Sequence, residues 1–247
     1  MVSFRINLAD TVIQVHAVHE STACFCRDYV TDSIPNITVT VLPEDIARER
    51  DRSRCEREYE GLAPRDFSSE YLETLALYRK IAEGLIAQDV VLFHGSALMM
   101  DGKAYIFTAK SGTGKSTHSS IWRRVFGDRV TMINDDKPLL RIREGGVTVY
   151  GTPWSGKHSL GSNISAPVSA ICSIYRAATN IAAPVSPKEA FPIILGQTYR
   201  PSDALRLRAT LSLAERIATT VPCYSLGCNM EDEAALVSYS AMKGDTP

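Results

Sequence analysis

The sequence of 247 residues lacks several features that would assign it to common classes of protein. It has no uninterrupted apolar run of about 18 residues, which excludes an ordinary membrane-spanning helix. Its formal net charge is -1, so the overall charge does not favour binding to nucleic acid or to an anionic membrane. The first ten residues carry charge and alternation where a signal peptide would have an apolar run. We therefore expect a cytoplasmic protein with no nucleic-acid or membrane partner.

The cysteine pattern excludes an obvious zinc site. The six cysteines include no C-x-x-C pair, the spacing that marks most structural zinc sites. In a chain that we expect to be cytoplasmic, thiols stay reduced. We therefore predict free, buried thiols at Cys24, Cys26, Cys55, Cys172, Cys223 and Cys228.

Residues 1–88 are predicted to form a small α+β N-terminal unit. Apolar residues alternate over residues 4–18 and again at Ile37, Val39 and Val41, which indicates half-buried strands. A helix with an apolar stripe should begin at Ser68 or Ser69 and continue past Leu85. Between these elements, residues 44–61 interleave acidic and basic side chains, which favours a solvated helix or a mobile loop.

Residues 89–247 are predicted to form a larger α/β domain. Asp101-Gly102 separates two apolar runs and is a strong hairpin signal, and residues 139–151 read as a second hairpin. Ser186-Pro187 with Glu189 is a capping box that should start a helix, and Ser202 or Asp203 should start a longer one reaching Thr219. A strand at 222–226 and a terminal helix capped by Asn229 complete the prediction.

The stretch AYIFTAKSGTGKST, residues 104–117, is the strongest chemical signal in the chain. It reads as an apolar strand, a loop of small residues and the start of a helix, and it matches the phosphate-loop pattern G-x-x-x-x-G-K-[ST] except at Ala109. Such a loop points backbone N–H groups at one place, where the helix start favours an anion. We expect Lys115 to reach the β- and γ-phosphates and Ser116 to bind Mg²⁺. The predicted nucleotide-binding residues are Ser111, Gly112, Thr113, Gly114, Lys115, Ser116 and Thr117.

Two adjacent carboxylates supply the metal-binding group and the base that a phosphate loop alone would lack. Asp135 and Asp136 follow an apolar strand that we expect to lie next to the loop strand. One carboxylate can hold Mg²⁺, a role that we assign with Ser116 to Asp135, and the other can accept a proton from an attacking hydroxyl. Their roles can be exchanged on sequence grounds. Adjacent carboxylates are also expected to raise each other's pKa.

Taken together, these motifs resemble the catalytic core of HPr kinase/phosphorylase, whose fold is related to that of phosphoenolpyruvate carboxykinase. The resemblance rests on His94-Gly95, Asp101-Gly102, the S-G-T-G-K-S of residues 111–116 and Asp135-Asp136, and it covers about residues 90–140. It implies a P-loop core with a mixed β-sheet, a possible homo-oligomer, and His94 beside the aspartates. It also implies that Lys115 and Ser116 hold Mg-ATP and that one aspartate is the general base. That family's downstream signature for phosphoserine and phosphorolysis is not recognisable here.

Weaker candidates lie outside this core. Lys157 and His158 follow a glycine-rich turn that suits a loop facing a phosphate or a substrate, although a plain surface loop explains them equally well. Lys137 directly follows the aspartates and would offset their charge. Arg200 would be an arginine finger or an ordinary surface residue.

The sequence therefore predicts an ATP- and Mg²⁺-dependent kinase that transfers the γ-phosphoryl group to a hydroxyl. The acceptor would be a serine of a protein or peptide, or a small alcohol. His94, Lys115, Asp135 and Asp136 are the predicted catalytic residues. Two alternatives remain open: an enzyme like phosphoenolpyruvate carboxykinase, and an accessory protein that binds ATP without catalysis.

Overall fold

The computed structural model describes residues 1–59, 61–110, 112–156 and 160–244, and it divides into two compact units. The first is Met1–Leu85 and the second is Ile86–Pro247. Three residues singled out from the sequence, Ser111, Lys157 and His158, lie outside the described residues.

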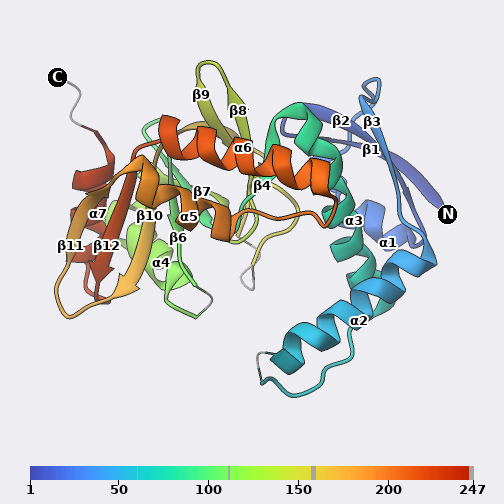
Figure 1. Ribbon diagram of the computed structural model, residues 1–247, viewed down its shortest axis with the longest axis horizontal. Coiled ribbons are helices and arrows are strands. Elements are labelled where there is room, and N and C mark those ends of the chain that lie inside the picture. The colour runs from blue at the N-terminus through green and yellow to red at the C-terminus, as the bar shows by residue number, and fades with distance from the viewer. Residues whose placement is uncertain (60, 111, 157–159, 245–247) are drawn as a thin grey trace. The chain divides into compact units, whose positions relative to one another are not determined.

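The N-terminal unit combines a three-stranded sheet with helices (Figure 1). Antiparallel β1 (Val2–Leu8) and β2 (Thr11–Ala17) join through a turn at Ala9 and Asp10, both with positive φ. Strand β3 (Ile37–Thr40) pairs parallel to β2. The remaining elements are α1 (Glu20–Phe25), η1 (Arg27–Tyr29), α2 (Pro43–Tyr59) and α3 (Ser69–Leu85).

The segment of interleaved acidic and basic side chains forms the helix α2. Of the two predicted alternatives, a solvated helix and a mobile loop, the helix is therefore correct. It is mostly exposed, and only Asp45, Ile46 and Glu49 are buried. Glu49 pairs with Arg79 of α3 at 2.8 Å, and Asp45 pairs with Lys80 at 2.6 Å. Burial opposes ionisation of Asp45, but hydrogen bonds from Lys80, the Leu42 amide and Arg48 outweigh it and lower its pKa. The helix is therefore held by buried charge pairs and not by an apolar stripe.

The C-terminal unit is built on one mixed sheet of nine strands. The order β4-β8-β9-β10-β6-β5-β7 is extended by β12 beside β10 and by β11 beside β12. Strand β10 runs parallel to both β6 and β12, and the other pairings are antiparallel. In chain order the elements are η2 (Ile86–Gln88), β4 (Val90–Leu92), β5 (Ser96–Met100), β6 (Lys103–Thr108), α4 (Lys115–Phe126), η3 (Gly127–Arg129), β7 (Val130–Asn134), β8 (Leu139–Arg143), β9 (Gly146–Tyr150), β10 (Ser165–Arg176), β11 (Ile181–Val185), α5 (Pro187–Gln197), α6 (Ala204–Thr220), β12 (Cys223–Cys228) and α7 (Glu233–Met242).

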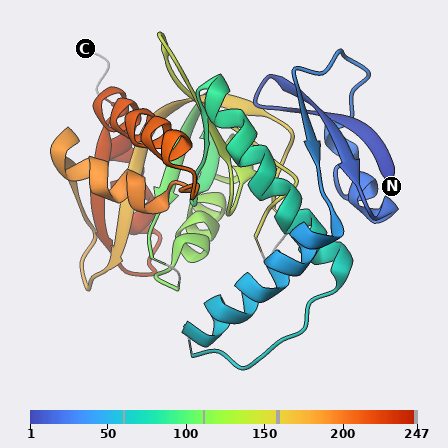
Figure 2. The same ribbon diagram turned by 45° about the vertical axis from the view of Figure 1, so that its right-hand side comes forward.

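Helices cover both faces of this sheet, as Figures 1 and 2 show. Because side chains alternate along a strand, β6 sends Ala104 and Ile106 to one core and Tyr105 and Phe107 to the other. The first core includes residues of α5 and α6, and the second includes Trp122 of α4 and residues of α7. The unit is therefore a mixed α/β structure with two apolar cores around one sheet.

Several sequence predictions need correction. The strand before the aspartates, β7, does not lie next to the loop strand β6, because β5 lies between them and pairs with both. Asn229 does not cap α7, whose N-cap is Asp232; the Asn229 side chain instead accepts a hydrogen bond from the Glu231 amide. All six cysteines are free as expected, but Cys24 and Cys55 are exposed and not buried.

The predicted capping box at Ser186 and Glu189 is present at the start of α5. Asp101 and Gly102 form the turn between β5 and β6, both with positive φ. Across the described ranges, no helix has both the length and the apolar character needed to cross a bilayer.

Candidate functional site

The glycine loop, residues 109–114, joins β6 to α4. Gly112 and Gly114 have φ values of 75° and 129°, which L side chains rarely adopt, and a Cβ added at either would meet only open space. The glycines are therefore needed for backbone conformation and not to avoid a clash. Ala109 is buried and does not have positive φ, so the pattern's first glycine is not required here.

The start of α4 is open to an anion. Gly114 is its N-cap, no side chain among the described residues caps the first turn, and Ser116 and Thr117 are exposed. The first N–H groups of a helix have no partner within the helix, and the helix dipole makes this end positive. One turn further on, Ile121 and Trp122 are buried in the core beneath the helix. The helix start is thus exposed on an element that is anchored by packing.

Arg176, at the end of β10, holds the glycine loop from the side. Its guanidinium donates hydrogen bonds to the carbonyl oxygens of Gly112 at 2.7 Å and Thr113 at 3.2 Å. Arg176 thus gives both carbonyl oxygens a charged hydrogen-bond partner. Arg176 was not singled out from the sequence, because only the parallel pairing of β10 with β6 brings it to the loop.

His94 lies at the centre of a cluster of polar side chains. Its Nε2 is 3.0 Å from Nζ of Lys115 and 3.4 Å from Oδ1 of Asp136. Its Nδ1 is 3.0 Å from Oε1 of Gln197, the last residue of α5. Lys115 also donates to the carbonyl of Ala109 at 3.3 Å, and Lys137 lies 3.9 Å from Asp136.

Backbone pairing explains why these distant residues meet. The segment 93–95 interrupts the strand that the sequence predicted from Val90 onward, and it lies between two other segments. On one side Phe93 donates to Pro138 O and Gly95 donates to Asp136 O, both at 3.0 Å. On the other, His94 donates to Gln197 O at 2.8 Å. The cluster is therefore fixed by three pieces of main chain and not by side-chain contacts alone.

The charges in the cluster shift pKa values in opposite directions. Burial opposes ionisation of Asp136, but the hydrogen bond with His94 and the charges of Lys137, His94 and Lys115 outweigh it, so its pKa lies below the ordinary value. Burial lowers the pKa of Lys115, and the nearby Asp136 partly offsets this. The expectation that the adjacent aspartates raise each other's pKa is therefore wrong for Asp136.

Asn134 organises the turn that carries both aspartates. Its side chain is fully buried, and its amide nitrogen donates to Thr152 and to the carbonyl of Trp154. Its amide oxygen accepts from the backbone N–H groups of Asp136 and Lys137, at 2.9 and 2.7 Å. Local bonds of this kind fix a tight turn.

Asp135 and Asp136 occupy different environments. The carboxylate of Asp135 is 6% exposed and accepts a hydrogen bond from the Gly156 amide. A Cβ at Gly156 would lie 3.0 Å from that carboxylate, so glycine allows the close approach. Asp136 instead faces His94 and has a side chain 30% exposed. The two carboxylates thus cannot have equivalent roles.

Of the residues predicted from the sequence, the structure brings His94, Lys115, Asp136 and Lys137 together. Ser116 and Thr117 lie at the exposed start of α4, and Arg200 is exposed. Gln197 and Arg176 are the contacts that sequence reasoning missed. Gln197 ends a helix more than 100 residues along the chain from His94, where no local motif marks it.

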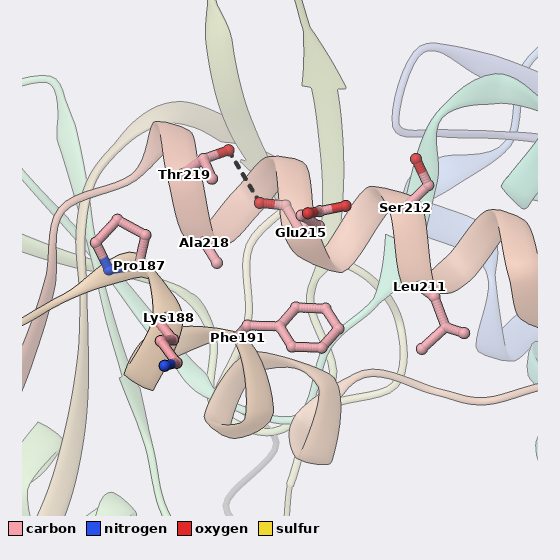
Figure 3. Close-up of a pocket in the computed structure, with 8 residues that line it drawn as sticks. All are labelled: Pro187, Lys188, Phe191, Leu211, Ser212, Glu215, Ala218 and Thr219. Carbon is pink, nitrogen blue, oxygen red and sulfur yellow. Dashed lines mark hydrogen bonds between the residues drawn. The ribbon is translucent and has the colours of Figure 1, made fainter.

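A cavity of about 660 Å³ lies elsewhere in this unit, between α5 and α6 (Figure 3). Phe191 and Leu211 contribute apolar side chains to its lining, and Thr219 donates to the main-chain oxygen of Glu215 beside it. None of the predicted site residues lines it. This cavity is therefore separate from the residues that the sequence predicts for the site.

Comparisons with known proteins give little that identifies the chain. No protein-family model matches it. No curated protein matches it either. Among solved structures, HPr(Ser) kinase/phosphatase from Coxiella burnetii aligns with 62% of this chain and 99% of its own, at 12% sequence identity and a TM-score of 0.34. Both values are too low to infer a shared fold or activity.

Proposed function

We propose that the chain is an ATP- and Mg²⁺-dependent phosphotransferase that transfers the γ-phosphoryl group to a hydroxyl of a protein, a peptide or a small molecule. The observation that carries this proposal is the cluster in which Lys115, at the uncapped start of α4, meets His94 and Asp136. Phosphoryl transfer requires three components: backbone amides that bind an anion, a lysine, and a carboxylate base.

In this proposal the phosphates bind at the backbone amides of residues 112–117 and at the Lys115 ammonium. Asp136 acts as the general base, because its carboxylate is partly exposed and lies in the cluster with His94 and Lys115. It accepts the proton of the attacking hydroxyl, whose oxygen forms a bond to the γ-phosphorus. The bond from that phosphorus to the β,γ-bridging oxygen breaks, and ADP leaves with the electron pair.

In this proposal the magnesium ion arrives with the nucleotide and depends on its phosphates. No cluster of three or more His, Cys, Asp or Glu residues suited to a metal is found in the described ranges. Mg²⁺ bound to nucleotides commonly uses one or two protein oxygens together with phosphate oxygens and water. Ser116 and Asp135 are the proposed protein ligands, and the ion would neutralise charge on the phosphates.

The test combines binding with transfer. Calorimetry should detect Mg-ATP binding to the wild-type protein, and labelled γ-phosphate should appear on one member of a panel of peptides, serine and other hydroxyl compounds. Lys115→Ala should weaken binding, whereas Lys103→Ala, which changes an exposed lysine at the start of β6, should not. A protein that binds no nucleoside triphosphate, or a Lys115→Ala variant with native binding and turnover, would refute the proposal.

Asp136→Asn separates binding from chemistry. The amide cannot accept the hydroxyl proton, so the rate of transfer should fall about 10²- to 10⁴-fold while the Kd for Mg-ATP changes little. Single-turnover assays and calorimetry on the same preparation measure both quantities. If ATP binds but is never hydrolysed or transferred by the wild type, an accessory nucleotide-binding role replaces the kinase. Decarboxylation of oxaloacetate with manganese would instead indicate a carboxykinase-like reaction.

A further inference from the structure

A second cavity adjoins the glycine loop. It measures about 490 Å³, within the range of about 300–1,000 Å³ typical of small-molecule sites. One side is formed by the loop and the start of α4, including Thr113 and Thr117. The other is formed by residues at the ends of β10 and β12, including Arg176 and Met230. None of the cluster residues His94, Lys115 and Asp136 lines it.

The topology places this cavity where a bound nucleotide would continue beyond its phosphates. Strands β6, β10 and β12 are parallel, so their carboxyl ends lie at one edge of the sheet. The glycine loop follows β6, and the cavity opens between that loop and the neighbouring carboxyl ends. Open α/β sheets bind ligands in the crevice outside the carboxyl ends of their strands.

The walls suit a flat, partly apolar group. Ile121 and Ile174 are buried and line the cavity. Met230 lines it as well and is 76% exposed, so its side chain is accessible to a ligand in the cavity. A methionine side chain adapts to a planar ring. The Arg176 guanidinium, fixed on the loop carbonyls, is a planar cation of the kind that stacks on aromatic rings.

A buried polar atom lies in the same wall. His118, 2% exposed, lines the cavity, and its Nδ1 has no hydrogen-bond partner among the described residues. Ser238 donates to Ala235 O and accepts from Trp122 Nε1, so Nε2 of His118, 3.1 Å from Ser238 Oγ, must be the protonated nitrogen. Nδ1 is then an unsatisfied acceptor, and such groups in folded proteins call for an explanation.

We propose that this cavity binds the nucleoside part of the nucleotide, with Met230 and Arg176 in contact with the base. The inference rests on the proposed function, since it assumes that the phosphates bind at the glycine loop. It assigns the two ends of the nucleotide to separate groups of residues. Lys115 acts on the phosphates alone, Met230 acts on the nucleoside alone, and Arg176 acts on both because it also holds the loop.

Calorimetry of the full chain with Mg-ATP and with Mg-tripolyphosphate tests this assignment. ATP should bind more tightly than tripolyphosphate, because only ATP fills the cavity. Met230→Ala should weaken ATP binding about 3- to 10-fold, from loss of apolar contact, and leave tripolyphosphate binding unchanged. Arg176→Ala should weaken both ligands. Leu205→Ala, which removes a comparably exposed side chain of α6 outside this cavity, should affect neither.

The outcomes separate this inference from the function on which it rests. Met230 is exposed, so its variant should keep the native circular dichroism spectrum and thermal midpoint. If Met230→Ala binds ATP as tightly as the wild type while Lys115→Ala loses binding, the nucleoside lies elsewhere and the phosphotransferase proposal stands. Equal affinities of the wild type for ATP and tripolyphosphate also overturn the inference. If neither ligand binds the wild type, both proposals fail.

Discussion

At the scale of single residues, the orientation of the His94 ring is set by its hydrogen-bond neighbours. The Gln197 amide oxygen lies 3.0 Å from Nδ1 and can only accept, which places a proton on Nδ1. Its Nε2 lies 3.0 Å from the Lys115 ammonium and 3.4 Å from Oδ1 of Asp136. Gln197 is thus a positioning residue, which acts on the cluster through His94.

We predict that Gln197→Leu slows phosphoryl transfer about 10-fold and changes the pH–rate profile, because the His94 ring loses the acceptor for its Nδ1 proton. Gln197→Glu keeps an acceptor at the same distance and should restore most of the rate. The Kd for Mg-ATP should stay near the wild-type value in both variants. Steady-state assays from pH 6 to pH 9, with calorimetry, measure these effects. Equal rates for Gln197→Leu and Gln197→Glu would contradict the positioning role.

Sequence reasoning works at this scale where the chemistry is local. The loop, Lys115 and the start of α4 lie within about a dozen residues, and their spacing alone predicts strand, loop and helix. Gln197 and Arg176 could not be found in this way, because their contacts depend on which strands pair. The direction of the pKa shift of Asp136 could not be predicted either, because it depends on the spatial proximity of His94 and two lysines.

At the scale of elements, the segment after β9 supports the aspartate turn. Thr152 and Trp154 supply the oxygens that bind Asn134, and Gly156 supplies the amide that binds Asp135. Gly151 begins this segment at a crowded crossing, where a Cβ would lie 1.9 Å from Ser162 O and 2.8 Å from Ile133 O. Both contacts are with main chain, which cannot move aside as a flexible side chain can.

We therefore predict that Gly151→Ala lowers the free energy of unfolding by about 2 kcal/mol or more, because the backbone must shift to accept the methyl group. Gly145→Ala is the matched control: its Cβ would meet no atom within 4 Å and its φ is not in the left-handed region. Urea unfolding followed by circular dichroism compares the two. A Gly151→Ala protein as stable as Gly145→Ala would show that the crossing relaxes without cost.

The sequence predicts helices and turns well where the signal lies in neighbouring residues. It predicts the position of a strand poorly, because that position depends on which strands pair. The capping box at Ser186 and the turn at Asp101-Gly102 depend on local backbone chemistry, and both are present. The position of β7 was wrong, because the tight β5–β6 hairpin places β5 between it and the loop strand. Strand order is a property of the whole sheet, which hydrophobic alternation does not encode.

At the scale of the whole molecule, the pH dependence of stability should contain a contribution from His118. Burial lowers the pKa of this histidine to about 4, whereas its ordinary value is 6.5. As the pH falls below 6.5, the unfolded chain gains a proton that the folded chain does not accept until about pH 4. The folded state is therefore favoured fully above pH 6.5 and loses stability as the pH falls through this window.

We predict that the His118 contribution lowers the unfolding free energy by about 1 kcal/mol for each pH unit between 6.5 and 4.5. His118→Gln removes the titration and should flatten the slope. Asp45 and Asp136 have pKa values lowered from 3.8, so their loss of ionisation falls below this window. Urea midpoints at half-unit pH steps provide the measurement, and an unchanged slope in His118→Gln would contradict the burial argument.

Strand β10 pairs with three other strands of the C-terminal unit, β9, β6 and β12. Its residues 165–167 run against β9, and residues 171–173 are hydrogen-bonded on both edges, to β6 and to β12. In deuterated solvent, the amides of Ile171, Cys172 and Ser173 should be among the last to exchange, because exposing them requires both cores to open together.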